Sequence, residues 1–297
     1  MILLDNRTPL DAVTFDAKDL EEKPFQTVVV KGMFCIERDK PVVMEEGAQE
    51  KLIVDDDLVP FKLGTDVHVR ATAYAPSGKA TSWRAGISVG ALKKYVTVTG
   101  PRAWMRAPLL GWSLTPPVAV NRVPLRYEFA YGGPGFARNP LGIGYVDPRK
   151  LTSDAVIAAP QILSDDGVPL VFGKDYPVET FLPVSEKWPP RGLAEGFEAC
   201  HAAPPSLVTE GYLRGNEVVE LLAMHPEHER FSFRLPNVLI AAAVTDRVGY
   251  RYGSPGRLDT VFVDMEAMRV MLAWRVVLPL YEDGAVCVDV AMRGRLE

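Results

Sequence analysis

The stretch that decides the fold is FQTVVVKGMFCI, residues 25–36, where β-branched and aromatic side chains crowd together. Val28, Val29 and Val30 have the density of β-branched residues that is typical of a buried strand. The whole chain carries 24 glycines and 25 prolines among 297 residues. Because neither residue is tolerated well inside a helix, the composition predicts short strands joined by many turns and irregular loops.

Alternating apolar residues predict further strands on both sides of this stretch. A second decisive stretch spans residues 258–280, where residues 260–264 and 269–278 read as two strands of a hairpin. A single helical turn over residues 264–271 is the alternative reading of their connection. Residues 83–99 are predicted to form another hairpin, which turns at residues 90–94 with Lys93 and Lys94 in the exposed connection. Four further stretches look like single strands: the one containing Val67 and Val69, residues 125–131, residues 217–223, and the one containing Val286 and Val288.

The predicted fold class is mainly β: a sandwich- or barrel-like single domain with long Pro/Gly-rich loops and few short helices. A hydrophobic content of 47% excludes disorder, and no repeat of 20–50 residues indicates a solenoid or propeller. Residues 1–24 are predicted to form an N-terminal extension, and residues 25–297 the single β-rich domain.

Charge and apolar content exclude two classes of partner. The net charge is −5 and no dense basic stretch is present, so no nucleic acid is expected as a partner. The longest apolar run, residues 238–244, is far shorter than the ~20 residues that span a bilayer, so no membrane is expected either. The chain has three cysteines, Cys35, Cys200 and Cys287. Because their number is odd and they are widely spaced, they are poorly suited to a disulfide framework and fit a reducing compartment. With no secretion signal in residues 1–7, the predicted location is the cytoplasm.

One stretch matches a nucleophile motif. Gly86-Ile87-Ser88-Val89-Gly90 has the G-x-S-x-G spacing that exposes a serine on a strand-to-helix turn. The residues that follow it look like a second strand, however, and no βαβ alternation supplies the usual sheet. A serine hydrolase that uses Ser88 is therefore one alternative function, and a strand that ends at Gly90 is the plainer interpretation.

No metal or cofactor site is predicted. His225 and His228 have H-x-x-H spacing, but Pro226 between them disfavours one helical face, so a solvated loop is expected rather than a zinc site completed by Cys200 and His201. The glycines of residues 132–144 lack the spacing of a phosphate loop, and the acidic residues 55–57 lack that of a calcium loop.

Tryptophans raise a second alternative, a carbohydrate-binding β-sandwich. Five are present, and they could line a sugar-binding face or anchor the core: Trp83, Trp104, Trp112, Trp188 and Trp274. Periodicity does not separate these roles. The residues by themselves indicate a cytosolic β-rich domain without a catalytic constellation.

Five blocks, in this order, resemble one bacterial family, domain-of-unknown-function family 2169, over about residues 25–280. They are residues 66–78 (DVHVRATAYAPSG), residues 87–90 (ISVG) with 98–104 (VTGPRAW), residues 124–133 (PLRYEFAYGG) with 138–144 (RNPLGIG), residues 188–191 (WPPR) with 202–205 (AAPP), and residues 258–264 (LDTVFVD) with 274–275 (WR) and 279–280 (PL). Departures from the family pattern include Pro101, Tyr131, the Cys200-His201 pair, and Ser206 with Leu207.

The resemblance implies a non-enzymatic role in type VI secretion. Proteins of this kind are cytoplasmic adaptors or chaperones that bind and stabilise a toxic effector and load it onto the VgrG spike. Such a protein needs a rigid scaffold and an adhesive surface rather than a nucleophile, metal or cofactor. Interfaces of this type rest on a few aromatic and arginine anchors, and Tyr131, Trp188 and Arg191 are the candidates within the family blocks, with a purely structural role as the alternative.

Overall fold

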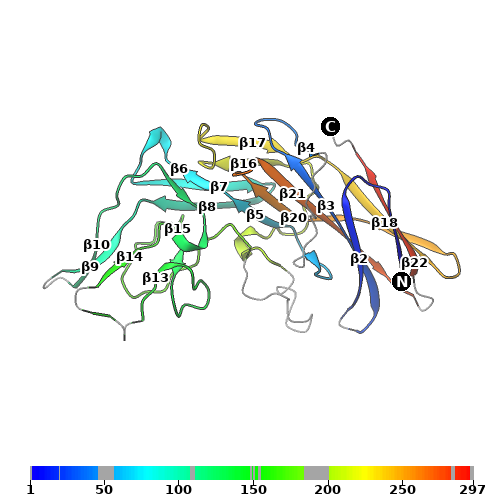
Figure 1. Cartoon of the computed structure of the whole chain (residues 1–297), viewed down its shortest axis with the longest axis horizontal. Helices are drawn as coiled ribbons and strands as arrows, with labels where there is room; N and C mark the ends of the chain where they lie inside the picture. Colours follow the sequence, from blue (N-terminus) through cyan, green and yellow to red (C-terminus); the bar gives the residue numbers. More distant parts are fainter. Residues whose placement is uncertain are drawn as a thin grey trace.

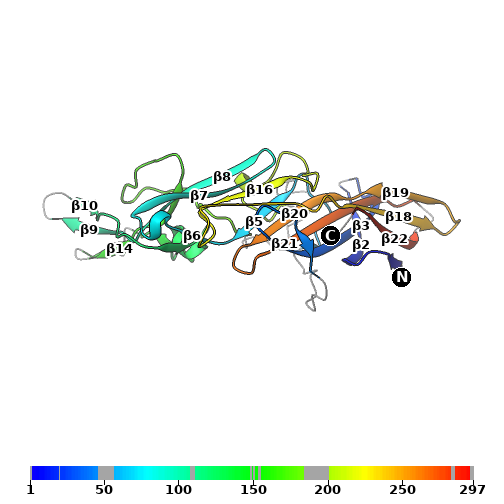
Figure 2. The same ribbon diagram turned by 90° about the horizontal axis from the view of Figure 1, so that it is seen from above.

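The computed structural model describes residues 2–19, 21–45, 57–107, 111–147, 149, 151–152, 155–183, 201–281 and 285–294. The described chain is mainly β, with several sheets of which none is closed. Figures 1 and 2 show an elongated, flattened molecule with the three largest sheets arranged along its long axis. The predicted β-rich class is confirmed, and the open sheets place the fold on the sandwich side of the sandwich-or-barrel prediction.

The largest sheet has six strands and forms the centre of the molecule (Figure 1). In spatial order these are β2 (Asp11–Lys18), β3 (Pro24–Cys35), β21 (Arg269–Pro279), β20 (Arg257–Asp264) and β5 (Asp66–Arg70), with β4 (Val43–Met44) paired to the end of β3. β5 runs parallel to β20 and the other pairs are antiparallel.

The second sheet has five strands, all paired antiparallel. In spatial order they are β15 (Ile162–Ser164), β8 (Leu92–Thr99), β7 (Ser82–Val89), β16 (Val218–Leu222) and β17 (Arg230–Arg234). β7 and β8 form a tight hairpin whose turn contains Gly90 at a φ of 57°, a backbone conformation that glycine adopts readily.

Smaller sheets extend the molecule at both ends of its long axis (Figure 1). At one end lies a four-stranded sheet of β1 (Leu3–Asn6), β22 (Ala285–Arg293), β18 (Leu239–Asp246) and β19 (Arg251–Pro255). At the other end lies a three-stranded sheet of β10 (Gly111–Leu114), β9 (Ala103–Ala107) and β14 (Val156–Ala158). Two-stranded pairs join β11 (Arg122–Pro124) to β6 (Thr72–Tyr74) and β12 (Tyr131–Gly132) to β13 (Ile143–Gly144).

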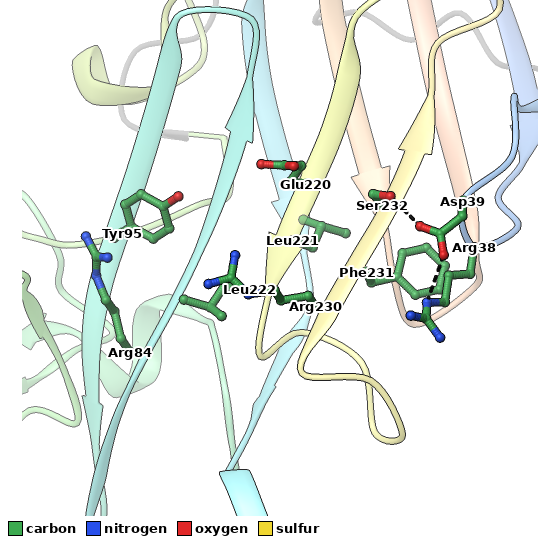
Figure 3. Close-up of a pocket in the computed structure, with 10 residues that line it drawn as sticks. All are labelled: Arg38, Asp39, Arg84, Tyr95, Glu220, Leu221, Leu222, Arg230, Phe231 and Ser232. Atoms are coloured by element: carbon green, nitrogen blue, oxygen red, sulfur yellow. Dashed lines mark hydrogen bonds and ion pairs between the residues drawn. The ribbon is translucent and has the colours of Figure 1, made fainter.

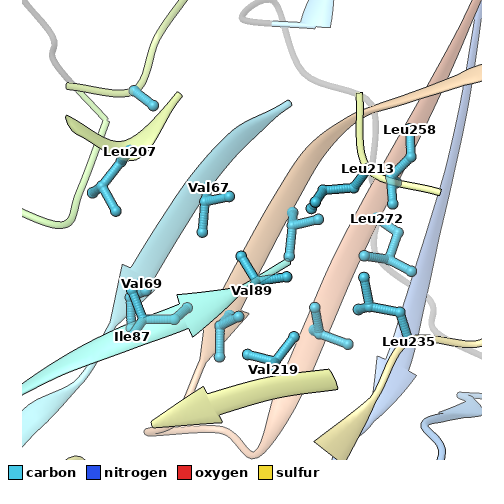
Figure 4. Close-up of a cluster of buried hydrophobic side chains, with 14 of the residues drawn as sticks. Val67, Val69, Ile87, Val89, Leu207, Leu213, Val219, Leu235, Leu258 and Leu272 are labelled. Atoms are coloured by element: carbon cyan, nitrogen blue, oxygen red, sulfur yellow. The ribbon is translucent and has the colours of Figure 1, made fainter. Parts of the chain in front are cut away.

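The core lies between the five-stranded and six-stranded sheets. Figure 4 shows Ile87, Val89 and Val219 from the five-stranded sheet facing Val67 and Leu272 from the six-stranded sheet. All five side chains are buried. Burying one such side chain contributes about 1.5–3 kcal/mol, so the alternation of apolar residues fixes which face of each strand turns inward.

The two decisive stretches fold as predicted. Residues 25–36 lie almost entirely in β3, and residues 260–264 and 269–278 lie in β20 and β21, which pair as a hairpin. The helical turn considered for residues 264–271 is wrong, because these residues are strand ends joined by a short turn. The turn contains Met268 at a φ of 53°.

Two local predictions are wrong. Residues 125–131 do not form one strand, because Tyr127–Phe129 is a 3-10 turn (η3) and only Tyr131 belongs to a strand, β12. Neither Lys93 nor Lys94 lies in the hairpin connection, because both are residues of β8; Lys93 is exposed there. The ammonium group of Lys94 pairs with Glu179 at a site where both side chains are nearly buried.

Helices are short. The described residues contain no helix of seven residues or more; besides η3 there are two three-residue 3-10 turns that begin at prolines, η2 (Pro76–Gly78) and η7 (Pro205–Leu207). The prediction of few short helices is confirmed. No helix among these residues is long and apolar enough to cross a membrane.

The first strands join the sheets of the main body. β1 pairs parallel to β22, and β2 pairs with β3 over its full length. Both strands lie inside residues 1–24, which the sequence assigns to an extension. The boundary at residue 24 stays a prediction.

Candidate functional site

The outer face of the five-stranded sheet carries the candidate site. Along β7, Ala85 and Ile87 point into the core, so Arg84, Gly86 and Ser88 line the opposite face. The strand register extends this outer face across the sheet. Gly86 lies opposite Tyr95 of β8 and Leu222 of β16, Leu222 lies opposite Arg230 of β17, and Ser88 lies between Lys93 and Glu220.

Several of these outward residues border a pocket of about 190 Å³, which we call the arginine groove (Figure 3). Figure 3 shows Tyr95 and Arg84 on one side, Glu220 and Arg230 in the middle, and the segment containing Arg38 on the far side. Its lining residues are Arg38, Asp39, Arg84, Tyr95, Glu220, Leu221, Leu222, Arg230, Phe231 and Ser232.

One wall of the arginine groove is a stack of side chains in fixed positions. A Cβ atom added to Gly86 would lie 2.3 Å from Cδ1 of Tyr95, so the tyrosine ring can lie against the sheet only because residue 86 is glycine. The Arg84 guanidinium sits 3.9 Å from the centroid of the Tyr95 ring. Asp165 holds Arg84 from the side, accepting hydrogen bonds from Nε at 2.9 Å and Nη2 at 2.6 Å. This wall is therefore preorganised.

The opposite wall is a short segment, residues 37–42, which turns at Arg38 and Asp39 and which we call the strap. It covers the free edge of β17 with main-chain hydrogen bonds: Asp39 donates to Ser232 at 2.7 Å, Arg234 donates to Lys40 at 2.9 Å, and Val42 donates to Arg234 at 2.9 Å. The Ser232 hydroxyl donates to the Asp39 carboxylate at 2.6 Å. The strap protects an edge that would otherwise expose unpaired backbone groups.

A pair of stacked histidines supports the strap. His225 and His228 lie in the turn between β16 and β17, with ring centroids 4.8 Å apart, and His225 also stacks on Phe231. Arg38 lies 3.3 Å from Nδ1 of His228. Because a guanidinium only donates, Nδ1 of His228 is the acceptor of this hydrogen bond. Burial and the neighbouring His228 lower the pKa of His225.

Ser88 contacts a carboxylate rather than a histidine. Its hydroxyl donates to Glu220 at 3.2 Å, and no described histidine hydrogen-bonds to it. The residues after the motif form the β7–β8 hairpin, so the strand reading of this stretch is confirmed and the strand-to-helix turn of a nucleophile elbow is missing here. A serine nucleophile is usually activated by a neighbouring histidine that takes the hydroxyl proton. Ser88 has a carboxylate as its hydrogen-bond acceptor instead.

Two of the three predicted anchors lie outside the described residues, namely Trp188 and Arg191. Tyr131 is described and is 5% exposed, with its ring edge-on to Phe136 and Tyr176. Its hydroxyl donates to the Lys174 carbonyl at 2.9 Å, and burial together with Asp175 raises its pKa to about 12. Tyr131 borders a separate, mainly apolar pocket of about 350 Å³ beside β15. Its role as a partner anchor stays a prediction.

Tryptophans mostly belong to the interior. Trp83, Trp104 and Trp274 are buried, and Trp112 stacks on Phe172 with ring centroids 4.1 Å apart. These four side chains pack against other side chains and do not form a continuous exposed face. Trp188, the fifth, is outside the described residues.

A buried network of charges on the back of the six-stranded sheet was missed by sequence reasoning. Lys62 pairs with Asp66 at 2.8 Å, and Asp66 also accepts hydrogen bonds from His201 Nδ1 at 2.6 Å and from the Ala202 backbone at 2.9 Å. Burial raises the pKa of Asp66, but Lys62, His201 and His68 outweigh it and hold that pKa well below the usual range.

A second part of the network lies beside it. Arg275 pairs with Asp259 at 2.5 Å and also donates to the carbonyls of Asp57 and Val59. Lys31 pairs with Asp57 at 2.7 Å, so Asp57 is buried and paired, and its assignment to a solvated turn is wrong. Four residues of the network come from the family-like blocks, so the fold brings separate blocks together as an internal scaffold: Asp66, Ala202, Asp259 and Arg275.

No metal centre forms among the described residues. No group of three or more His, Cys, Asp or Glu side chains in this part of the chain is placed to hold an ion. His225 and His228 are stacked rather than converging, and both use Nδ1 as a hydrogen-bond acceptor, since the Glu227 backbone donates to His225 at 3.2 Å. Asp55, Asp56 and Cys200 lie outside the described residues.

Sequence comparison identifies one family. The model of DUF2169, described as uncharacterized protein conserved in bacteria, matches residues 21–275. No curated protein matches the chain. No solved structure matches it either.

Proposed function

The chain belongs to the DUF2169 family of bacterial proteins, and from this premise we propose that it is a non-enzymatic cytoplasmic adaptor and chaperone of type VI secretion. In this role it binds and stabilises an effector toxin and loads it onto the VgrG spike. The effector and the spike protein are its partners.

The observation that carries the proposal is the arginine groove. Protein interfaces depend on a few arginine and aromatic side chains held in place before binding, because ordering them beforehand lowers the entropy lost on association. Tyr95 and Arg84 meet this requirement through the Gly86 contact and the Asp165 pair. They stand on a sheet whose inner face is packed into the core.

The surroundings of the groove suit protein binding better than chemistry. Ser88, the one hydroxyl in a nucleophile-like motif, lies beside Glu220 in the middle of paired strands. Substrate pockets usually have volumes of about 300–1,000 Å³, whereas the arginine groove has about 190 Å³. A small groove with preorganised anchors fits an extended protein partner.

Co-expression tests the proposal. The chain is tagged and expressed with the effector and VgrG proteins encoded beside it, and each partner is followed in pull-down and in the soluble fraction. We expect co-purification of the effector and a lower soluble yield of effector when the chain is omitted. Failure to retain either partner, with the effector equally soluble alone, would contradict the adaptor role.

A matched pair of variants assigns the binding to the groove. Tyr95→Ala removes the stacked ring, whereas Tyr250→Ala removes a tyrosine that is 63% exposed on the distant four-stranded sheet region. We expect Tyr95→Ala to weaken retention of the effector and Tyr250→Ala to leave it unchanged. Equal retention by both variants, with both folded by circular dichroism, would place the binding surface elsewhere.

A further inference from the structure

We propose that the arginine groove recognises an acidic segment of the protein partner, with one carboxylate docking on Arg230. This inference rests on the proposed function, since it names the chemistry of the segment bound at the same site. Three observations lead to it: the charge that remains after internal pairing, the position of Arg230, and the stacking of Arg84 on the Tyr95 ring.

Internal ion pairs cancel most charges around the groove. Arg84 pairs with Asp165 at 2.6 Å, Arg38 with Asp39 at 3.2 Å, and Lys40 with Glu37. Within the described part of the chain, the outward residues of the sheet then leave three cations without an ion pair against one acid, Glu220. The three cations are Lys93, Arg230 and Arg234.

This basic face belongs to a chain whose net charge is −5. The face therefore opposes the charge of the rest of the molecule, and it directs negatively charged partners to this side. Charge complementarity across an interface contributes mainly to specificity and association rate, which suits a protein that must find one client among many.

Arg230 is the cation best placed to dock a carboxylate. It borders the groove, it is exposed, and it has no ion pair or hydrogen bond with any described residue. Arg234, by contrast, donates to the Asn216 carbonyl at 3.2 Å. A free guanidinium can hold a carboxylate through two parallel hydrogen bonds. Glu220 lines the same groove and repels other carboxylates. The bound segment must therefore place its acidic side chain next to Arg230 and away from Glu220.

Acidic protein fits the groove better than nucleic acid. Single-stranded nucleic acid binds by stacking bases on aromatic faces along a continuous basic track. One face of the Tyr95 ring is already taken by the Arg84 guanidinium, which is centred 3.9 Å from the ring, and the Cδ1 edge of the ring lies close to Gly86. Glu220 also interrupts the row of cations between Lys93 and Arg230.

Fluorescence anisotropy with defined probes tests the proposal. Fluorescein-labelled decaglutamate, a neutral Gly-Ser peptide of equal length and a thymidine oligonucleotide of equal length are titrated with the full chain. We expect decaglutamate to bind best, and to weaken as NaCl is raised from about 0.05 to about 0.5 M, because exposed charges are screened. The R230E variant should weaken decaglutamate binding by about fivefold or more. The control R293E makes the same charge change on β22, at an exposed position of another sheet, and should retain wild-type binding.

Three results would overturn the inference. The first is that decaglutamate binds no more tightly than the neutral peptide. The second is that R293E weakens decaglutamate binding as much as R230E does. The third is that the chain binds the oligonucleotide more tightly than decaglutamate. Pull-down of the effector by R230E separates this inference from the adaptor role. If R230E retains the effector as well as the wild type does, the acidic-segment inference fails and the adaptor role stands. If the wild type retains no effector, the adaptor role itself fails, whatever the peptides do.

Discussion

Removing one partner of the buried Arg275–Asp259 pair should destabilise the protein severely. The two side chains are 3% and 1% exposed, and Arg275 also donates to two backbone carbonyls that cover the sheet. In Arg275→Met the Asp259 carboxylate loses its counter-charge and both carbonyls lose their donor. Breaking a buried pair in this way costs about 3–5 kcal/mol, a large fraction of the 5–15 kcal/mol that stabilises a typical domain.

The double variant distinguishes a buried pair from a general packing defect. Asp259→Leu combined with Arg275→Met removes both charges, so neither is left buried alone. We expect the free energy of unfolding to fall by less than the sum of the two single losses, with a coupling of about 1–3 kcal/mol. The exposed pair between Arg126 and Glu266, with side chains 47% and 37% exposed, provides the control; Arg126→Met should cost less than about 1 kcal/mol.

Urea unfolding followed by tryptophan fluorescence and circular dichroism measures all four variants. Trp274, which is adjacent to Arg275 and buried, contributes to the fluorescence signal. If Arg275→Met loses no more stability than Arg126→Met, or if the two single losses simply add, the buried network does not have the scaffold role that the structure indicates.

Three further predictions concern other parts of the fold. Burial lowers the pKa of His68 from an unperturbed 6.5 to about 4, so the folded state holds His68 neutral. The contribution of this group to stability is therefore complete above pH 6.5, and about 3 kcal/mol of it is lost as the pH drops from 6.5 to 4. The urea midpoint of His68→Gln should lack this dependence on pH. Gly86→Val should lower stability by about 1–3 kcal/mol or more, because the new side chain collides with Tyr95 and the Lys94 carbonyl. Thermal unfolding measures this loss, and an unchanged Tm would show that the Tyr95 ring has room to move. Ser88→Ala should retain wild-type effector binding, and a serine-reactive fluorophosphonate probe should not label wild-type Ser88; labelling lost in the variant would support the hydrolase instead.

The parts of the fold that sequence reasoning found are those with strong local patterns. β3 and the β20–β21 hairpin contain dense β-branched runs, and their buried faces follow directly from alternation. Residues 125–131 look equally strand-like, yet they split into η3 and β12. The Asn139 side-chain amide donates to the carbonyls of Tyr127 and Tyr131, and such a long-range tertiary contact leaves no local signal.

The candidate site was beyond sequence reasoning for a related reason. Arg84, Gly86 and Ser88 alternate with core residues, so an outward-facing row on β7 could have been proposed from the sequence. Tyr95 reaches that row through the predicted hairpin. Glu220 and Arg230 could not have been placed there, because they reach it only through strand pairing between distant segments. The buried network was hidden in the same way, since an aspartate or lysine next to apolar residues is normally expected to be exposed.

Size-exclusion chromatography of purified proteins tests the central claim most directly. The chain is mixed with its neighbouring effector and VgrG, and each fraction is assayed for all three proteins. The account predicts that they elute together in one peak, and that Tyr95→Ala elutes apart from the effector. Separate elution of the wild-type chain from both partners would contradict the claim that this protein works by binding other proteins.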